Sequence, residues 1–431
     1  MCGQAGRRMG PGRAGKLWRV TAADPTFDVG PLPEDAHPAV FPLRLDAFTS
    51  AGGVDYPEEG EPDYIPAHRR IGAFQNGRPV GHAGAWDFGQ WFGGRRLPMA
   101  GVAAVTVSAE MRGQGVATAM MRAVLRQSLE QGDVISCLYP TAPSVYRNVG
   151  YAFAGTRIER TLRTAALNDL PVPTNPPRLR PFDFDHDLAS VAALLDAQAA
   201  TVQGRIDRGL TRHRNLAEPD DNLRAWVAER DGQIVGYLQT VRSEPSPREH
   251  TSFRQKVLNM SAVDRDTWLT LWRLVGSQAT VCRHTDFISA PHEPLLDVLS
   301  LPPGELDTFE QFWMARLLDT AAAVSARGWP AGADVSVGLT VADDLLGHNN
   351  GTFLLTVADG QGRLDARAGQ VRDPQLNRPR LDIGALSALF TGHVSAASLV
   401  LHGRLTGAAE SEINALDTAF AAPQPWMHDY F

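Results

Sequence analysis

The sequence predicts a mixed α+β fold that is built from more than one domain. A β-branched run at 105–107 is followed by a glycine-rich loop and then by apolar residues at helical spacing from 116 to 131. The hairpin pattern at 76–81 recurs at 231–236, which indicates a second copy of the same unit. Beyond residue 303, grouped strand patterns are followed by grouped helix patterns, as is typical of an α+β domain.

The composition is that of an ordinary globular protein with room for two or three domains. The chain has 431 residues, of which 43% are hydrophobic and 21% are charged. A net charge of −7 argues against a nucleic-acid partner. Almost all basic residues are arginines, and because only Lys16 and Lys256 are lysines, a lysine nucleophile is disfavoured.

The sequence indicates neither a membrane span nor a metal site. Its apolar runs stay shorter than the ~18–20 residues that cross a bilayer. The cysteines at 2, 137 and 282 form no CxxC or Cys/His ligand spacing, which predicts reduced thiols in the cytoplasm and no bound metal. The start of the chain is basic without the apolar core of a signal peptide, so we expect a disordered tail over 1–30.

A helix and a strand meander are predicted after this tail. Residues 34–48 favour a helix that is started or interrupted by a proline, and residues 71–107 favour strands. Asn76 and Gly77 mark a tight hairpin turn. The segment from Trp86 to Trp91 is expected to link the next pair of strands.

An anion-binding loop is predicted between residues 107 and 116. A strand that ends in glycines before a helix points several N–H groups at one spot, with the positive end of the helix dipole behind them. Gly113 and Gly115 let the backbone approach a pyrophosphate, and Arg112 adds a planar positive charge. The loop matches neither the GxxxxGK[ST] phosphate loop nor the GxGxxG dinucleotide fingerprint.

A second motif follows the helix that ends at Gly132. A strand is predicted at 134–138, and residues 143–151 (PSVYRNVGY) predict a short helix with Tyr146 and a Gly-Tyr turn into another strand. Together with the Arg-x-x-Gly-x-Ala pattern of the loop, this segment resembles the GCN5-related N-acetyltransferases. An ordinary glycine turn between a strand and a helix is the alternative. Tyr139 and Tyr151 flank Tyr146, and we interpret both as core or rim aromatics.

The resemblance implies roles for these residues. Tyr146 would be the general acid that protonates the leaving thiolate. The backbone N–H of Val105 or Val107 would stabilise the oxyanion. The acetyl-CoA site would consist of Val105, Thr106, Val107, Arg112, Gly113, Gln114, Gly115, Val116, Ala117 and Thr118.

The middle of the chain predicts a second copy that lacks the cofactor loop. The proline-rich stretch 171–177 is a stiff linker, and a helix is predicted at 187–201. A hairpin at 225–242 is followed by the segment 257–264 and a predicted helix at 265–276, and this region contains no Arg-x-x-Gly-x-Ala. The Asp183-x-Asp185-x-Asp187 run lacks the glycine and glutamate of a calcium loop, so it is interpreted as a helix N-cap cluster.

The last part predicts an amphipathic helix at 307–327, followed by strands and then by helices. The strands are expected at 334–341, 352–358 and 364–370, and the helices at 383–391, 394–401 and 408–420. This order resembles a sterol-carrier-protein-like domain. Such domains can form a lipid tunnel, and a purely structural role is the alternative.

The three parts in this order resemble the enhanced-intracellular-survival family of bacterial N-acetyltransferases. The resemblance implies tandem acetyltransferase-like domains, each with a mixed central sheet flanked by helices, at 31–168 (catalytic) and 178–300 (degenerate), and a sterol-carrier-like α+β domain at 304–431. It also implies acetyl-CoA as cosubstrate without a metal, a small-molecule or peptide amine acceptor such as an aminoglycoside, a polyamine or lysine, and a homohexamer. Ala104 stands where some relatives carry an aromatic that lines the acceptor pocket, so the acceptor is not carried over.

The chain ends in an aromatic cluster that is expected to be buried. Trp426, Tyr430 and Phe431 are close together, and Pro423 and Pro425 keep the segment extended. The resemblance implies that the Phe431 carboxylate accepts the proton of the attacking amine, without a covalent enzyme intermediate. The alternatives are that the aromatics plug the third domain, and that the protein binds CoA or lipid as a regulator without turnover.

Overall fold

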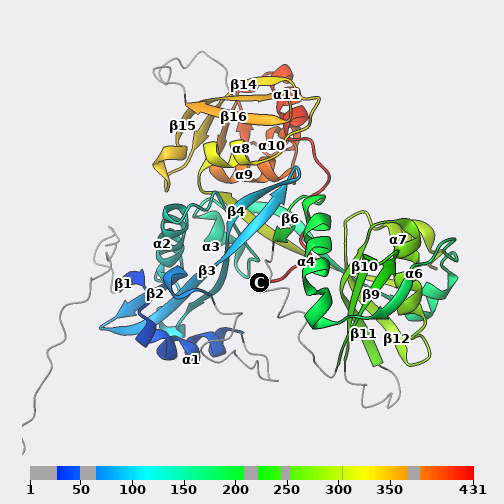
Figure 1. The fold of residues 1–431 in the computed structure, drawn as a ribbon. Coiled ribbons are helices and arrows are strands. Elements are labelled where there is room, and N and C mark those ends of the chain that lie inside the picture. Colours follow the sequence, from blue (N-terminus) through cyan, green and yellow to red (C-terminus); the bar gives the residue numbers. More distant parts are fainter. Residues whose placement is uncertain (1–26, 49–64, 208–221, 244–252, 303, 367–378) are drawn as a thin grey trace, which may run out of the picture. The chain divides into compact units, whose positions relative to one another are not determined.

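The computed structural model describes residues 27–48, 65–207, 222–243, 253–302, 304–366 and 379–431 (Figure 1). Residues 1–26 of the tail predicted over 1–30 lie outside these ranges. The prediction is wrong for residues 28–30, because they belong to strand β1 (Asp28–Pro31), which pairs with a neighbouring strand. The described residues divide into two compact units. The first contains 27–48, 65–86 and 102–128, and the second contains 87–101 and the chain from 129 onward.

The first unit contains the predicted helix, the first hairpin and the glycine-rich loop. β1 pairs with β2 and β2 pairs with β3, both antiparallel. Asn76 and Gly77 have φ values of 51° and 77°, so the predicted hairpin turn is confirmed. The elements are β1, η1 (Glu34–Ala36), α1 (His37–Phe48), η2 (Ala67–Arg69), β2 (Arg70–Gln75), β3 (Arg78–Phe92), β4 (Arg95–Val107), η3 (Ala109–Met111) and α2 (Val116–Glu130), of which β3, β4 and α2 continue into the second unit.

β3 corrects one prediction in this region. The expected link from Trp86 to Trp91 is wrong, because β3 runs without interruption to Phe92. The chain turns instead at Gly93 and Gly94, whose φ values are 59° and 76°. These left-handed conformations suit glycine, which has no Cβ to clash with the backbone.

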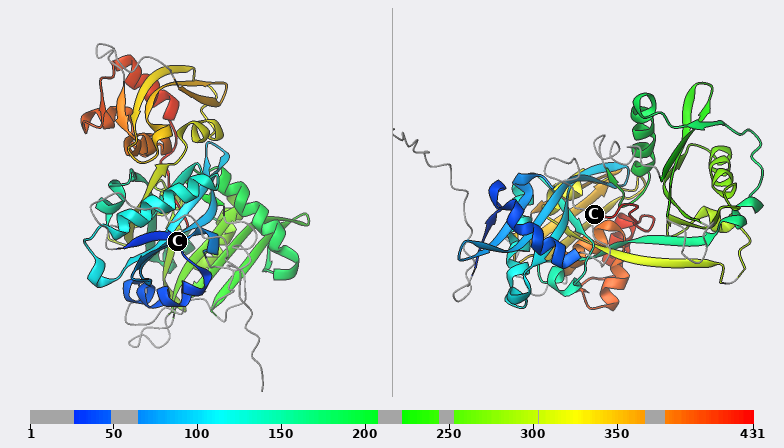
Figure 2. Two further views of the ribbon diagram at one scale, coloured as in Figure 1. Left: turned by 90° about the vertical axis from the view of Figure 1, so that its left-hand side faces the viewer. Right: turned by 90° about the horizontal axis from the view of Figure 1, so that it is seen from below.

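The second unit begins with a group of strands around β5 (Ile135–Leu138). Met99–Gly101 of β4 pair in parallel with Ile135–Cys137 of β5. β13 (Leu306–Leu317) is antiparallel to β5 on one side and to β6 (Ala152–Arg163) on the other. Figure 2 shows β6 and β13 running side by side over their length. The short helix α3 (Pro143–Arg147) precedes β6, and η4 (Thr164–Asp169) follows it.

β13 overturns the predicted helix at 307–327. Residues 306–317 are a strand, and only α8 (Thr320–Ala326) is helical. The side chains of Trp313 to Leu317 are all buried, because this end of the strand lies between β5 and β6. Phe309 and Phe312, whose spacing mimicked a helical face, are 60% and 43% exposed. Pairing with two distant strands therefore outweighs the local pattern.

The middle segment is a mixed sheet with helices, as predicted. Its strands follow the order β12–β11–β10–β9–β7, and β12 pairs with β6. One core lies around Leu238, Leu269 and Phe287, and a second lies around Val191 and Tyr237. The elements are β7 (Arg178–Pro181), α4 (Phe184–Ala200), β8 (Ile206–Asp207), β9 (Leu223–Arg230), β10 (Gln233–Arg242), β11 (Phe253–Ala262), α6 (Arg265–Gly276), β12 (Cys282–Ser289) and α7 (Pro294–Val298).

Two local predictions for the middle segment are confirmed. Asp231 and Gly232 form the hairpin turn, with φ values of 51° and 74°. The Asp183 side chain accepts hydrogen bonds from the N–H groups of Asp185 and His186 at 3.0 and 3.2 Å, so the acidic run is an N-cap of α4.

The C-terminal segment is a five-stranded sheet with helices. Its strand order is β16–β15–β14–β17–β18. Every residue of helix α9 (Ile383–Thr391) is buried. The last residues of the strand expected at 364–370 lie outside the described ranges. The elements are α8, β14 (Val335–Ala342), η5 (Gly347–Asn349), β15 (Gly351–Ala358), β16 (Gln361–Ala366), β17 (Arg380–Asp382), α9 (Ile383–Thr391), α10 (Ala396–Leu401), β18 (Leu405–Thr406) and α11 (Glu410–Phe420).

Candidate active site

The chain after α11 is extended and runs along β6. The N–H of Thr156 donates to the carbonyl of Pro425 at 3.2 Å, and the N–H of Met427 donates back to Thr156 at 2.9 Å. The Nε of Arg157 donates to the carbonyl of His428 at 3.3 Å. These main-chain contacts fix the path of the tail, in agreement with the predicted extended conformation.

The aromatic end of this tail lies against β3, β4 and the end of β5. The Phe431 ring packs edge-on against Phe88 and Tyr139, with centroids 5.3 and 5.7 Å apart. A Cβ placed on Gly101 would lie 3.0 Å from the Phe431 ring. Tyr430 packs on Tyr139 with a centroid distance of 4.7 Å. These contacts do not support the alternative that the two rings plug the third domain.

Gly101 marks the place where the β4–β5 pairing ends. The last paired residues of the two strands are Gly101 and Cys137. Cys137 is buried, and its thiol donates to the Oε1 of Gln90 at 3.0 Å. Burial raises the pKa of the Cys137 thiol, which opposes formation of a nucleophilic thiolate there.

Tyr146 lies on α3, which begins with Pro143 in the favoured first-turn position. Its side chain is only 6% exposed. Burial raises the pKa of the phenol, and a hydrogen bond with Thr141 opposes this shift. The hydroxyl therefore stays protonated at neutral pH, as a proton donor must.

The turn after α3 holds Tyr146 in place. Its carbonyl accepts hydrogen bonds from the N–H groups of Val149 and Tyr151, both at 3.1 Å. The Tyr151 hydroxyl lies 2.7 Å from the Oγ of Ser136, which donates to the carbonyl of Ala100 at 3.0 Å. Tyr151 is 1% exposed, which agrees with its interpretation as a core aromatic. Sequence reasoning missed Ser136, because a lone serine in a buried strand carries no distinctive signal.

The predicted anion loop lies in the first unit. Gly113 and Gly115 have φ values of 78° and 81°, and a Cβ on either would meet nothing within 4 Å. The ladder of α2 begins with the N–H of Ala119, which donates to the carbonyl of Gly115 at 3.0 Å. The N–H groups of residues 116–118 precede this bond, so they are free of helical partners. Open space beside such amides fits a pyrophosphate.

Arg112 extends from this loop with an exposed side chain. Its Nε donates to the carbonyl of Val107 at 3.3 Å. Its ion pair with Asp46 is long, at 3.5 Å, and both side chains are exposed. Such a pair contributes little stability, so the guanidinium can reorient towards a phosphate.

Strand β4 is irregular just before Val105. Ala104 has a φ of 55°, which is rare for a residue with a side chain. The Nδ1 of His82 lies 3.3 Å from the carbonyl oxygen of Ala104. The irregularity directly precedes the two N–H groups predicted to stabilise the oxyanion, and alanine gave no sequence signal for it.

The structure groups the predicted residues by unit. Residues 105–107 and 112–118 lie in the first unit, whereas Tyr146 and Phe431 lie in the second. Across the described ranges, no set of three or more His, Cys, Asp or Glu side chains is arranged to bind a metal. Within the same ranges, no helix has both the length and the hydropathy to cross a membrane.

Comparisons with known proteins agree with the motifs at both ends of the chain. Residues 28–154 match the acetyltransferase (GNAT) domain family, and residues 320–428 match the sterol carrier protein domain family. An uncharacterized N-acetyltransferase of Streptomyces avermitilis is 28% identical over 429 residues, which cover 93% of this chain and 99% of the relative. The crystal structure of Eis1 from Mycobacterium abscessus is similar in fold, with a TM-score of 0.72, 20% identity, and coverage of 94% of this chain and 100% of that one.

Similarity to a solved structure from Kribbella flavida establishes the family of this chain. This GCN5-related N-acetyltransferase is 30% identical, has a TM-score of 0.80, and covers 94% of this chain and 98% of its own. The predicted fold class of tandem mixed sheets with a sterol-carrier-like domain is thereby confirmed. Because the similarity extends over nearly the whole of both proteins, the chain belongs to the GCN5-related N-acetyltransferases and is an acyltransferase.

Proposed function

We propose that this N-acetyltransferase moves the acetyl group of acetyl-CoA directly onto a primary amine, with Tyr146 as general acid and the Phe431 carboxylate as general base. One observation carries the proposal. The last residue of the chain packs on Phe88, Gly101 and Tyr139, where the pairing of β4 with β5 ends.

The environment of Phe431 suits a base. An α-carboxylate has a pKa of ~3.5 in water and is a weak base there. In our proposal it acts as the base because its aromatic side chain is held by neighbouring rings, which keeps the carboxylate in one place. Its negative charge also attracts a cationic amine, and in our proposal the carboxylate accepts the proton that this amine must lose before it attacks. Phe431 contributes the carboxylate, and Phe88 and Tyr139 hold its ring.

Tyr146 suits the opposite role. Its buried phenol has a raised pKa, so it carries a proton at neutral pH. When the thiolate leaves, a nearby hydroxyl can donate that proton. The buried thiol of Cys137 is a poor nucleophile, which favours direct transfer over a covalent acyl-enzyme.

GNAT domains use acetyl-CoA, which supplies the thioester acyl group. In our proposal the N–H groups of 116–118, the two loop glycines and Arg112 hold its pyrophosphate. The N–H of Val105 or Val107, after the irregular Ala104, stabilises the oxyanion. Thr106 and Gln114 complete the predicted binding segment.

We also propose that the chain belongs to the enhanced-intracellular-survival family within the GCN5-related N-acetyltransferases. Membership of the enhanced-intracellular-survival family would imply a homohexamer and acceptors such as aminoglycosides, polyamines or lysine side chains. The net charge of −7 and the terminal carboxylate favour a cationic acceptor of this kind. A cytoplasmic location also stays a prediction.

The test uses the full chain, acetyl-CoA, a panel of amines and a thiol reagent. We expect CoA release that depends on a polyamine or aminoglycoside, and loss of at least ~100-fold in kcat when a few residues are added after Phe431. The matched control carries the same residues at the N-terminus and keeps full activity. Full activity with the C-terminal extension would reject Phe431 as base. CoA binding without turnover on any amine would favour the regulatory alternative.

A further inference from the structure

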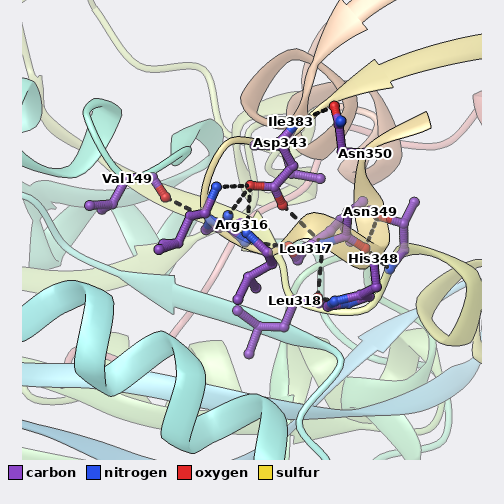
Figure 3. A network of polar contacts seen from close by, with 12 residues as sticks. Val149, Arg316, Leu317, Leu318, Asp343, His348, Asn349, Asn350 and Ile383 are labelled. Carbon is purple, nitrogen blue, oxygen red and sulfur yellow. Dashed lines mark hydrogen bonds and ion pairs between the residues drawn. The ribbon is translucent and has the colours of Figure 1, made fainter. Parts of the chain in front are cut away.

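We propose that Arg316, which lies on β13 far from Tyr146 in the sequence, is the positioning residue for Tyr146; the inference rests on the proposed role of Tyr146 as general acid. Figure 3 shows the Arg316 guanidinium between the main chain of Val149 and the carboxylate of Asp343. Arg316 is fully buried. Burying a charged side chain costs free energy unless the charge is paired and hydrogen-bonded. The groups that bond to Arg316 therefore show which parts of the chain it connects.

Each nitrogen of the Arg316 guanidinium has a partner. Its Nε donates to the carbonyl of Val149 at 2.6 Å, and its Nη1 donates to the carbonyl of Leu317 at 2.9 Å. Its Nη2 donates to the Oδ1 of Asp343 at 2.7 Å. Burial lowers the pKa of Arg316 and the Asp343 charge raises it, so the guanidinium stays charged at neutral pH.

Asp343 is itself fixed by the loop that follows β14. Its Oδ1 accepts hydrogen bonds from the N–H groups of Leu345 and Leu346 at 3.0 and 3.1 Å. Its Oδ2 accepts from the Nδ2 of Asn349 at 3.0 Å. The C-terminal segment therefore fixes the carboxylate of Asp343, which we call the anchor. Arg316 bonds to this carboxylate and to the carbonyl of Val149, and so connects the anchor to the turn that contains Val149.

Val149 connects this anchor to Tyr146. The N–H of Val149 donates to the carbonyl of Tyr146 at 3.1 Å, while the Val149 carbonyl accepts from Arg316. Both polar groups of Val149 are thus engaged, one by the general acid and one by the anchor. Moving the Val149 carbonyl would shift the main chain that orients Tyr146.

Gly150 leaves room for the guanidinium beside this turn, because it has no side chain. Its φ is 87°, a conformation that favours glycine. A Cβ at Gly150 would lie 2.9 Å from the Nε of Arg316 and 2.7 Å from the Cγ2 of Ile383. The Gly-Tyr turn therefore serves the contact with β13 and α9 as well as the entry into β6.

A purely structural role and a positioning role make different predictions for Arg316→Lys. Lysine keeps a positive charge near Asp343 but cannot donate to Val149 and Asp343 in the same fixed geometry. If Arg316 positions Tyr146, kcat falls by about 10-fold or more while the KM for acetyl-CoA changes by less than about 2-fold. If Arg316 is only structural, the folded variant has the kcat of the unmodified protein and a lower unfolding temperature.

Ser387→Ala is the matched control. The Ser387 hydroxyl accepts from the N–H of Leu317 at 3.0 Å and donates to the carbonyl of Ile383 at 2.7 Å. The substitution therefore disturbs the same packed region without touching Val149. We expect it to lower stability and to leave kcat within about 2-fold of the unmodified protein.

The experiment measures kcat and KM for Arg316→Lys, Tyr146→Phe and the double variant. We expect Arg316→Lys to cost nothing further in the Tyr146→Phe background, because both changes act on one hydroxyl. If a folded Arg316→Lys variant keeps its kcat while Tyr146→Phe is impaired, the positioning role of Arg316 is wrong and the role of Tyr146 as general acid is unaffected. Normal kcat in Tyr146→Phe would instead reject Tyr146 as general acid. If Arg316→Lys does not fold, Asp343→Asn keeps the shape of the anchor, removes its charge, and is read by the same criteria.

Discussion

The hydroxyl of Tyr139 donates a 2.6 Å hydrogen bond to the main-chain carbonyl of Asp429, which lies 290 positions later in the chain. Burial raises the pKa of Tyr139, so its hydroxyl remains a donor at neutral pH. The same ring packs on Tyr430 and Phe431. One side chain at the end of β5 thus holds the last three residues, and with them the proposed base.

Tyr139→Phe is expected to loosen the tail while keeping the aromatic packing. Loss of one neutral hydrogen bond costs about 1 kcal/mol, so kcat should fall by about 3- to 10-fold. Steady-state kinetics measure this, with the KM for acetyl-CoA unchanged. Tyr237→Phe, which removes a buried hydroxyl from the middle segment, serves as the control and should be fully active. A Tyr139→Phe variant as active as this control would mean that the contacts with Thr156 and Arg157, together with the retained aromatic packing, are enough to hold the tail.

The pH dependence of kcat tests Tyr146. Its pKa is raised, so the phenol keeps its proton through neutral and mildly alkaline pH. We expect no alkaline fall of kcat below about pH 10. Tyr146→Phe should lower kcat by about 100-fold or more and leave CoA affinity intact. An alkaline limb near pH 8 that disappears in Tyr146→Phe would contradict the raised pKa.

Arg112→Ala is expected to weaken acetyl-CoA binding. A charge-assisted hydrogen bond to phosphate contributes about 1.5–3 kcal/mol, so the KM should rise by about 10- to 150-fold with little change in kcat. Arg78→Ala is a suitable control, because Arg78 is also exposed and in the first unit but pairs with Glu110. Equal CoA affinity of the two variants in calorimetry would remove Arg112 from the site.

The sequence predicted elements where the cause is local. The turns at Asn76-Gly77 and Asp231-Gly232 need left-handed backbone, which their residues supply, and the structure has it at all four positions. The strand, glycine loop and helix around Arg112 were also predicted from local features, namely the β-branched run, the two glycines and the helical spacing of apolar residues. Asp183 caps α4 as predicted, although the helix begins at Phe184, three residues before the expected start at 187.

Prediction from the sequence failed where an element depends on contacts with residues far away in the chain. Phe309, Phe312 and Leu317 have spacings that a helix also satisfies, and only pairing with β5 and β6 makes their segment a strand. The role proposed for Arg316 could not be predicted, because its partners Val149 and Asp343 come from other elements. An arginine inside the apolar run at 313–318 was the one available signal of a buried charge.

The middle segment is expected not to bind CoA, and its structure gives a physical reason. In the first unit, residues 108–115 lie between β4 and α2, whereas only Val263 and Asp264 lie between β11 and α6. The Asp264 carboxylate accepts from the N–H of Thr267 at 2.8 Å and pairs with Arg230. Arg230 and this N–H lower the pKa of Asp264 to about 2, so an anion already caps the helix.

Calorimetric titration of the full chain should therefore give one CoA per chain. Asp264→Ala should lower the free energy of unfolding by about 0.5–2 kcal/mol through loss of the cap, without creating a second site, because no glycine loop is present to approach a phosphate. Asp264→Ser retains a capping oxygen without the charge and should lose less stability. Two equivalents of CoA bound to the unmodified chain would show that the short β11–α6 connection can hold the cofactor, and that the middle segment is a second working copy.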